Sequence, residues 1–337
     1  MAAIYVRSRT ADLANKMIDT YGREINYMRI SITDRCNLRC RYCMPAEGIE
    51  KVPMNRILTY EEILRICETA ADMGISRYKI TGGEPLVRKG CMDLIRKMKK
   101  IPGVEQITLT TNGQQLPEMI EQLAEAGIDG LNISMDSLRE DRYAFITGGG
   151  ELHKTLAAIN KSISAGIRTK VNCLLQKKLN EDEIPDFAAF AFEKGIDVRF
   201  IEIMPVGFGN PEAGIANDAV LKVIQERYPT LTKDETVHGN GPAVYYRLPG
   251  NNGAIGLISA MNHSFCESCN RIRLTSQGLI KPCLCYEDGV DLRPALASDS
   301  DDPLREALEK AIRMKPAGHT FYDRTTVEPK AMSQIGG

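Results

Sequence analysis

The sequence predicts an α/β fold, an open, partial barrel of six βα units with a smaller β-containing extension at its C-terminal end. Two observations carry this prediction. Strand-like segments alternate with helix-like segments from residue 27 to residue 205, at the spacing of parallel βαβ units. Beyond residue 205 the alternation stops, and short strand patterns joined by turn residues follow. Six strands are too few to close an eight-stranded barrel.

Each unit of the expected barrel can be located in order. The expected strands are Tyr27–Thr33, Arg77–Thr81, Gln106–Thr110, Gly130–Ser134, Arg168–Leu175 and Asp197–Ile203. Thr59 and Glu62 form a capping box that starts the first helix, which Gly74 ends. The later helices are expected at Met92–Lys99, Pro117–Ala126, Leu152–Ala165 and Glu183–Lys194.

The chain divides into three expected regions. Residues 1–27 form an N-terminal arm, residues 28–205 the partial barrel, and residues 206–337 a C-terminal region with a flexible Gly-Gly tail. In the last region we expect helices and strands at Asp218–Tyr228, Ala243–Leu248, Ala254–Ser259, Arg271–Thr275, Leu279–Leu284 and Leu304–Met314.

Composition excludes several classes of protein. The 337 residues carry a formal charge of −1, which argues against a general nucleic-acid binder. Ten cysteines are too sparse for a disulfide scaffold, and their clustering favours metal binding in a reducing compartment, so we expect a cytoplasmic protein. No signal peptide is evident, and no apolar run approaches the ~20 residues that cross a membrane.

Cys36, Cys40 and Cys43 follow the first expected strand on a single loop. A cubane iron–sulfur cluster takes four thiolates. Three cysteines therefore leave one iron open to a small chelating molecule. Zinc or core packing are the alternatives, but zinc requires a fourth ligand and no histidine is near in sequence.

Cys266, Cys269 and Cys283 form a second set, with Cys285 close behind. Four thiolates at this spacing suit tetrahedral zinc, which the spacing alone favours. Arg271 and Arg273 follow directly, two residues apart on an expected strand, so both side chains project from one face. Guanidinium groups match phosphate oxygens, which favours an anionic substrate beside this second set.

The run from Arg29 to Pro45, RISITDRCNLRCRYCMP, resembles the signature of radical S-adenosylmethionine (SAM) enzymes, and in particular that of the GTP 3′,8-cyclases of molybdenum cofactor biosynthesis. The resemblance extends over roughly residues 27–337. It implies that Cys36, Cys40 and Cys43 hold a 4Fe–4S cluster that binds SAM. It also reverses the zinc interpretation, because it implies a second 4Fe–4S cluster on Cys266, Cys269 and Cys283, whose open iron binds guanine.

The resemblance further implies individual site residues. Those for SAM are Tyr42, Gly83 in the turn Gly82-Gly83-Glu84-Pro85, Ser134 and Met204. Those for GTP are Arg29, Lys79, Thr110, Lys170, Arg271, Ile272 and Arg273. The family has arginine where this chain has Lys79. Lysine keeps the positive charge but lacks the forked guanidinium group that can donate two hydrogen bonds to one phosphate. Arg271 and Arg273 are expected to be catalytic as well, together with Gly336 and Gly337, a double glycine that enters the active site in these cyclases.

The implied reaction begins with an electron from an external donor. Cleavage of SAM gives a 5′-deoxyadenosyl radical that removes the 3′ hydrogen of GTP, and the ribose radical attacks C8 of guanine. The product, (8S)-3′,8-cyclo-7,8-dihydroguanosine 5′-triphosphate, passes to cyclic pyranopterin monophosphate synthase. The oligomeric state stays open, with a homodimer as one option. The alternative function is a radical SAM enzyme with an auxiliary cluster that acts on a peptide or another substrate.

Overall fold

The computed structural model describes residues 16–50, 52–261, 265–323 and 326–336. Its strands form one twelve-stranded sheet in the order β12-β11-β10-β1-β2-β3-β4-β5-β6-β9-β8-β7. The strands are β1 Tyr27–Ser31, β2 Arg77–Thr81, β3 Gln106–Thr111, β4 Gly130–Ser134, β5 Thr169–Leu174, β6 Asp197–Ile201, β7 Thr232–Asp234, β8 Val244–Arg247, β9 Ala254–Ile258, β10 Arg271–Leu274, β11 Leu279–Lys281 and β12 Val290–Asp291.

The expected six-stranded barrel forms the centre of this sheet, and the C-terminal region extends it at both edges. Strand β10 pairs in parallel with β1, and β9 pairs in parallel with β6. The outer strands β11, β12, β8 and β7 then add in antiparallel fashion. The segment after residue 205 is therefore part of the barrel sheet and not a separate β layer.

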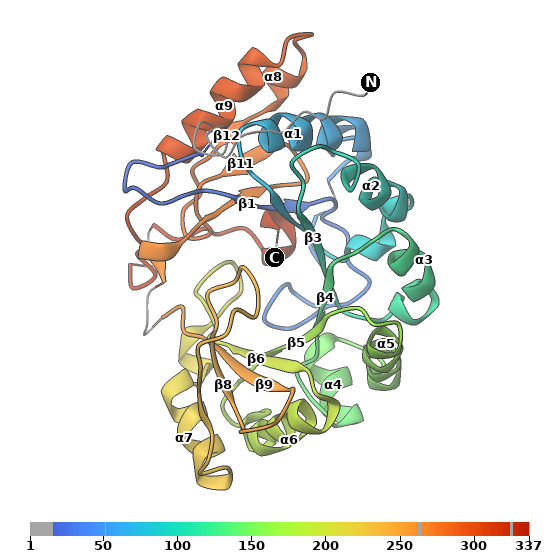
Figure 1. Ribbon diagram of the computed structural model, residues 1–337, viewed down its shortest axis with the longest axis vertical. Coiled ribbons are helices and arrows are strands. Elements are labelled where there is room, and N and C mark those ends of the chain that lie inside the picture. The colour runs from blue at the N-terminus through green and yellow to red at the C-terminus, as the bar shows by residue number, and fades with distance from the viewer. Residues whose placement is uncertain (1–15, 51, 262–264, 324–325, 337) are drawn as a thin grey trace, which may run out of the picture.

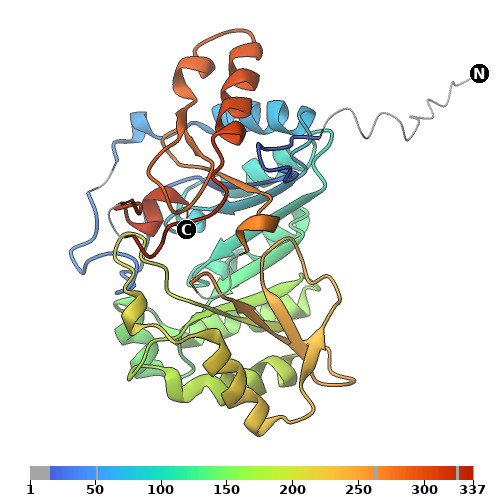
Figure 2. The same ribbon diagram turned by 90° about the vertical axis from the view of Figure 1, so that its left-hand side faces the viewer.

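Helices cover the outer side of the sheet, where α1 to α6 form an arc (Figure 1). The α-helices of the described chain are α1 Tyr60–Asp72, α2 Cys91–Met98, α3 Ile120–Glu125, α4 Glu140–Thr147, α5 Leu152–Ser164, α6 Ile184–Lys194, α7 Asn217–Arg227, α8 Arg293–Leu296, α9 Asp302–Arg313 and α10 Met332–Ile335, and of these α10 lies on the inner side, where it lines the cavity described below. The 90° view places α8 and α9 at one end of the molecule and α7 at the other (Figure 2). None of the described helices is long and apolar enough to cross a bilayer.

The core lies between the strands and these helices. Alternate strand residues such as Ile30, Ile80, Leu109 and Ile133 are fully buried there, and the residues between them face the inner side of the sheet. The expected capping box is confirmed, because the Thr59 side chain accepts a hydrogen bond from the Glu62 amide and the Glu62 side chain bonds back. Helices α4, α8 and α10 were not expected, since they lack a long apolar repeat.

Candidate active site

Both cysteine sets line one cavity of about 340 Å³ on the inner side of the sheet. The strand order explains how residues so distant in sequence meet, because β10 lies directly beside β1. The expected residues that line this cavity are Cys36, Cys40, Cys43, Tyr42, Gly83, Ser134, Met204, Arg29, Lys79, Thr110, Arg271, Arg273, Cys266, Cys269 and Cys283.

The N-terminal cysteine loop is fixed to helix α4 and to the end of β4. The amides of Arg39 and Arg41 donate to carbonyls of Thr147 and Ile146. The Tyr42 hydroxyl donates to an Asp136 carboxylate oxygen at 2.8 Å. Burial raises the pKa of Asp136 to about 6. The loop therefore depends on a helix, α4, that the sequence analysis did not identify.

The Gly82-Gly83-Glu84-Pro85 turn packs against the start of the same loop. A side chain at Gly83 would place its Cβ 2.3 Å from the Arg35 carbonyl oxygen, so only glycine fits. The Glu84 amide donates to that carbonyl at 2.8 Å. Its buried carboxylate accepts hydrogen bonds from Thr111 and Asn112 at 2.8 and 2.7 Å, and burial raises its pKa to about 7. The turn thus ties the cysteine loop to β3.

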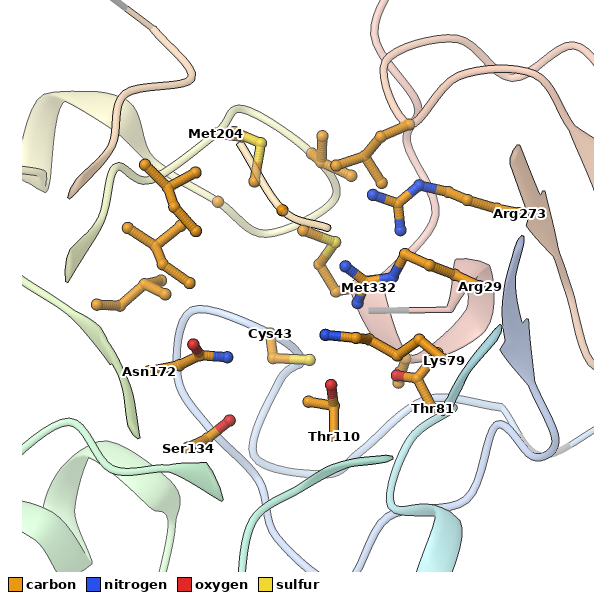
Figure 3. A pocket seen from close by; sticks show the side chains of 18 of the residues that line it. Arg29, Cys43, Lys79, Thr81, Thr110, Ser134, Asn172, Met204, Arg273 and Met332 are labelled. Atoms are coloured by element: carbon orange, nitrogen blue, oxygen red, sulfur yellow. The ribbon is translucent and has the colours of Figure 1, made fainter. Parts of the chain in front are cut away.

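A row of cations crosses the inner face of three neighbouring strands. Arg29 is paired in register with Arg273 on one side and with Lys79 on the other, so all three side chains point the same way. Figure 3 shows their charged ends converging in the cavity, across from Ser134 and Asn172. Arg271 lies two residues before Arg273 and also lines the cavity.

Arg273 is buried and Arg29 and Lys79 are half-buried, and the described residues provide none of these three cations with an anionic partner. Burial and the positive charges of Arg271 and Arg199 lower the pKa of Arg29 to about 10, and the Lys79 and Arg273 pKa values also fall, chiefly through burial. No carboxylate in the described ranges forms a salt bridge with any of the three, and the Arg29 Nε atom has no hydrogen-bond partner there. Such a site is suited to a polyanion, which would relieve the mutual repulsion.

The second cysteine set lies near the Arg271 and Arg273 end of the row. Burial acts to raise the pKa of the Cys269 thiol. The positive charges of Arg271 and Lys315 outweigh burial, and the net effect lowers this pKa to about 6. Cys285 is fully buried and its sulfur accepts a hydrogen bond from the Thr320 amide. It is absent from the cavity lining, unlike Cys283. Within the described chain, no three His, Cys, Asp or Glu side chains are grouped tightly enough to hold a single metal ion.

Two expected residues lie elsewhere. Lys170 lines a separate cavity of about 60 Å³, where its ammonium pairs with Asp197 at 2.6 Å and contacts the Tyr245 hydroxyl at 3.1 Å. The Ile272 side chain is fully buried in the core. Strand alternation turns it away from Arg271 and Arg273, so only its backbone can face the cavity.

The C-terminal helix α10 approaches both halves of the site. Met332 and Ser333 line the cavity together with Cys43, and Ser333 lowers the pKa of the Cys43 thiol against the larger effect of burial, which raises it. Arg273 donates to the Gly336 carbonyl at 3.3 Å. Gly336 has a φ of 86° and ends α10 in the left-handed region, which favours glycine. Gly337 lies outside the described residues.

Several lining residues were missed by the sequence analysis. Asn172 and Arg199 come from β5 and β6, and both carry buried side-chain atoms that lack hydrogen-bond partners in the described chain. A polar residue inside an apolar strand, as in the Asp197–Ile201 run, is a signal that could have identified Arg199. Lys315 lies in a segment without periodicity, so no sequence pattern indicated its position in the site.

Comparison with known proteins bears on the whole chain. Residues 30–191 match the Radical SAM superfamily, and residues 196–321 match Molybdenum Cofactor Synthesis C. A "GTP 3',8-cyclase" of Clostridium perfringens is 44% identical over 323 residues, covering 95% of this chain and 100% of that protein. A protein of the same name from Alkaliphilus metalliredigens is 45% identical over 326 residues, with the same coverage.

Solved structures show the same fold at low identity. Streptococcus suis SuiB bound to S-adenosylmethionine is 16% identical, with a TM-score of 0.60, and the match covers 92% of this chain and 76% of that one. The structure of SuiB bound to its precursor peptide SuiA gives the same TM-score and identity over 91% and 74% of the two chains. At this identity the likeness concerns the fold alone.

Proposed function

The chain belongs to the GTP 3′,8-cyclase family of radical SAM enzymes, and we propose that the residues gathered in its central cavity carry out the cyclisation. The enzyme converts GTP to (8S)-3′,8-cyclo-7,8-dihydroguanosine 5′-triphosphate in molybdenum cofactor biosynthesis. The observation that supports the assignment best is that two cysteine sets line one cavity together with a row of cations that form no salt bridge within the described residues.

The donor sets fit the cofactors of this family, two 4Fe–4S clusters and SAM. Cys36, Cys40 and Cys43 would hold one cluster, and Cys266, Cys269 and Cys283 the other. Each set supplies three thiolates, one fewer than a cubane takes. When bound, the first cluster and SAM together supply an adenosyl radical that removes a hydrogen atom from GTP.

The protein's own part is to hold SAM and GTP in register. Tyr42, Gly83, Ser134 and Met204 surround the N-terminal cysteines and would hold SAM. Asp136 fixes the Tyr42 side chain through its hydrogen bond, so the loop position is set before SAM arrives. A fixed geometry lowers the entropic cost of bringing the reacting atoms together.

The cation row would bind the triphosphate of GTP. Arg29, Arg271 and Arg273 offer forked donors that match phosphate oxygens, and Lys79 and Thr110 extend the row along the neighbouring strands. Pairing of three strands fixes the cations of the row in register. With the triphosphate bound to the row, the guanine base would lie toward Cys266, Cys269 and Cys283. Lys170 pairs with Asp197 and lines the separate smaller cavity, so it would act from outside this row.

Helix α10 and the glycines after it would complete the site. Residues of this helix line the cavity beside Cys43, and Arg273 donates to the Gly336 carbonyl, so the segment would join the SAM half to the GTP half. Deletion of Gly336 and Gly337 should leave both clusters and SAM binding intact but abolish cyclisation, because Arg273 loses its contact. A separate peptide ending in Gly-Gly should partly restore product. Cyclisation at the normal rate by the deletion variant would contradict this role.

The proposed partners beyond GTP are an external one-electron donor and, for the product, cyclic pyranopterin monophosphate synthase. The donor is required because cleavage of SAM consumes one electron. A homodimer remains an option that sedimentation of the loaded enzyme would test.

The deciding experiment is anaerobic incubation of the reconstituted protein with SAM, a reductant and one nucleoside triphosphate at a time. GTP alone should give 5′-deoxyadenosine and a cyclised nucleotide in equal amounts. ATP, CTP and UTP should give neither above background. Equal 5′-deoxyadenosine with every nucleotide, and no modified nucleotide, would contradict the proposal and favour the peptide-modifying alternative.

A further inference from the structure

Lys315 occupies an unusual position between the segments that carry the second cysteine set. It follows helix α9, its side chain is only 3% exposed, and it lines the cavity. Its ammonium donates to the Arg271 carbonyl at 2.8 Å and to the Pro282 carbonyl at 2.9 Å. Arg271 lies two residues after Cys269, and Pro282 directly precedes Cys283. One side chain thus joins the backbones beside two of the three cysteines.

The segment that follows Lys315 reaches the third cysteine through Arg23. This arginine is buried, and Asp19 holds it by an ion pair at 2.6 Å. It donates to the Cys266 carbonyl at 2.8 Å and to the Pro316 carbonyl at 2.6 Å. Lys315 and Arg23 therefore connect all three cysteine-bearing segments.

The charge of Lys315 has no carboxylate partner among the residues described. Burial lowers the pKa of Lys315, and the sulfurs of Cys269 and Cys283, which line the same cavity, act in the opposite direction and raise it. A buried ammonium is costly unless an anion compensates it. A cluster bound by these thiolates would supply that anion.

We propose that Lys315 is a positioning residue for the second iron–sulfur cluster, and that its ammonium raises the reduction potential of that cluster. The proposal rests on the assignment of Cys266, Cys269 and Cys283 as cluster ligands. Cluster potentials follow local charge and hydrogen bonds to sulfur. A cation at this position favours the reduced cluster because the added electron makes the cluster more negative.

The test compares Lys315→Met, Lys315→Gln and Lys315→Arg in full-length protein whose Cys36, Cys40 and Cys43 are replaced by Ala, so that only the second cluster contributes. Iron content and the midpoint potential from an anaerobic titration followed by electron paramagnetic resonance are measured. Met and Gln should shift the midpoint to more negative potential, and Arg should leave it near that of the parent. Lys99→Met is the matched control, since Lys99 pairs with Asp129 away from the cavity.

Arg23→Met separates position from charge. It removes the connection to Cys266 but leaves the ammonium in place, so it should lower iron content without shifting the midpoint of the cluster that remains. A potential unchanged in both Lys315→Met and Lys315→Gln would overturn the proposal. The same Lys315 variants are also made in protein that keeps Cys36, Cys40 and Cys43. Loss of SAM cleavage there would overturn the proposal too, because Lys315 would then be needed for the fold as a whole. A parent protein that binds zinc and no iron would instead refute the second cluster itself.

Discussion

The two cysteine sets line one cavity, yet the charges around Cys40 and around Cys269 are opposite in sign. Burial raises the pKa of Cys43 to about 11, and burial with the nearby Asp136 raises that of Cys40. At Cys269 the cations Arg271 and Lys315 overcome burial and bring the pKa to about 6. One set lies in an apolar and acidic setting, the other in a basic one.

If the two sets hold clusters as proposed, this difference would separate two tasks. An acidic, buried setting disfavours an added electron, which suits a cluster that must give its electron to SAM. A basic setting favours an anionic ligand and a more oxidising cluster, which suits substrate binding. The cation row between them belongs to the second task, because Arg271 and Arg273 lie on the strand that directly follows Cys269.

Replacing one ligand of the N-terminal set should give the largest effect. In Cys40→Ala, SAM cleavage should be abolished, because the cluster that binds SAM is lost, while the second cluster stays. The measurement is 5′-deoxyadenosine formed under reducing conditions. Cys67→Ala, which alters a core cysteine of α1, should cleave SAM normally. Normal cleavage by Cys40→Ala would remove the functional contrast between the sets.

Removing the second set tests the same contrast from the other side. The triple replacement of Cys266, Cys269 and Cys283 by Ala should lose about half of the iron, since one of two cubanes is gone. It should still bind SAM. Metal analysis and SAM binding are measured on one preparation. Loss of zinc with no loss of iron would establish a structural zinc site in place of a second cluster.

Asp136 should make stability depend on pH in a way that reflects the buried N-terminal setting. Its pKa is about 6 in the folded protein, above the ordinary value of 3.8. The folded state therefore holds the extra proton between these values, and the free energy of unfolding should fall as pH rises from 4 to 6, by at most about 3 kcal/mol. Asp136→Asn should flatten this slope in urea titrations, whereas the exposed Asp93→Asn should not. An identical slope in both variants would exclude Asp136.

The cation row should show the smallest effect. Hydrogen bonds between charged groups contribute roughly 1.5–3 kcal/mol, so Arg273→Ala should weaken GTP binding by about ten- to a hundredfold. SAM binding should not change. Arg305→Ala, which removes an exposed salt bridge with Asp72, is the control for calorimetry. GTP affinity equal to that of the control would remove Arg273 from the site.

Local patterns were enough to predict the six central strands and the Thr59 cap, because these depend on neighbouring residues. The pairing of β10 with β1 could not be predicted, since nothing near Arg271 in the sequence specifies a partner at Arg29. Lys315 could not be predicted for the same reason, because its side chain bonds to the carbonyls of Arg271 and Pro282, which are distant in the sequence. The burial of the Ile272 side chain was foreseeable, because strand alternation alone places it on the face opposite to Arg271. Helix α10 is too short for any periodic signal.

The addition of C-terminal strands to both edges of the barrel sheet has a consequence for the order of synthesis. A ribosome that has completed β1 to β6 has produced a sheet with two unpaired edges, since their partners β10 and β9 come later in the chain. Unpaired edges attract other chains, and the pairing of β1 with β10 must wait for most of the polypeptide. A cluster on Cys266, Cys269 and Cys283 could load only after most of the chain has been made, and a nascent chain halted before residue 254 should aggregate through the unpaired edges of its sheet.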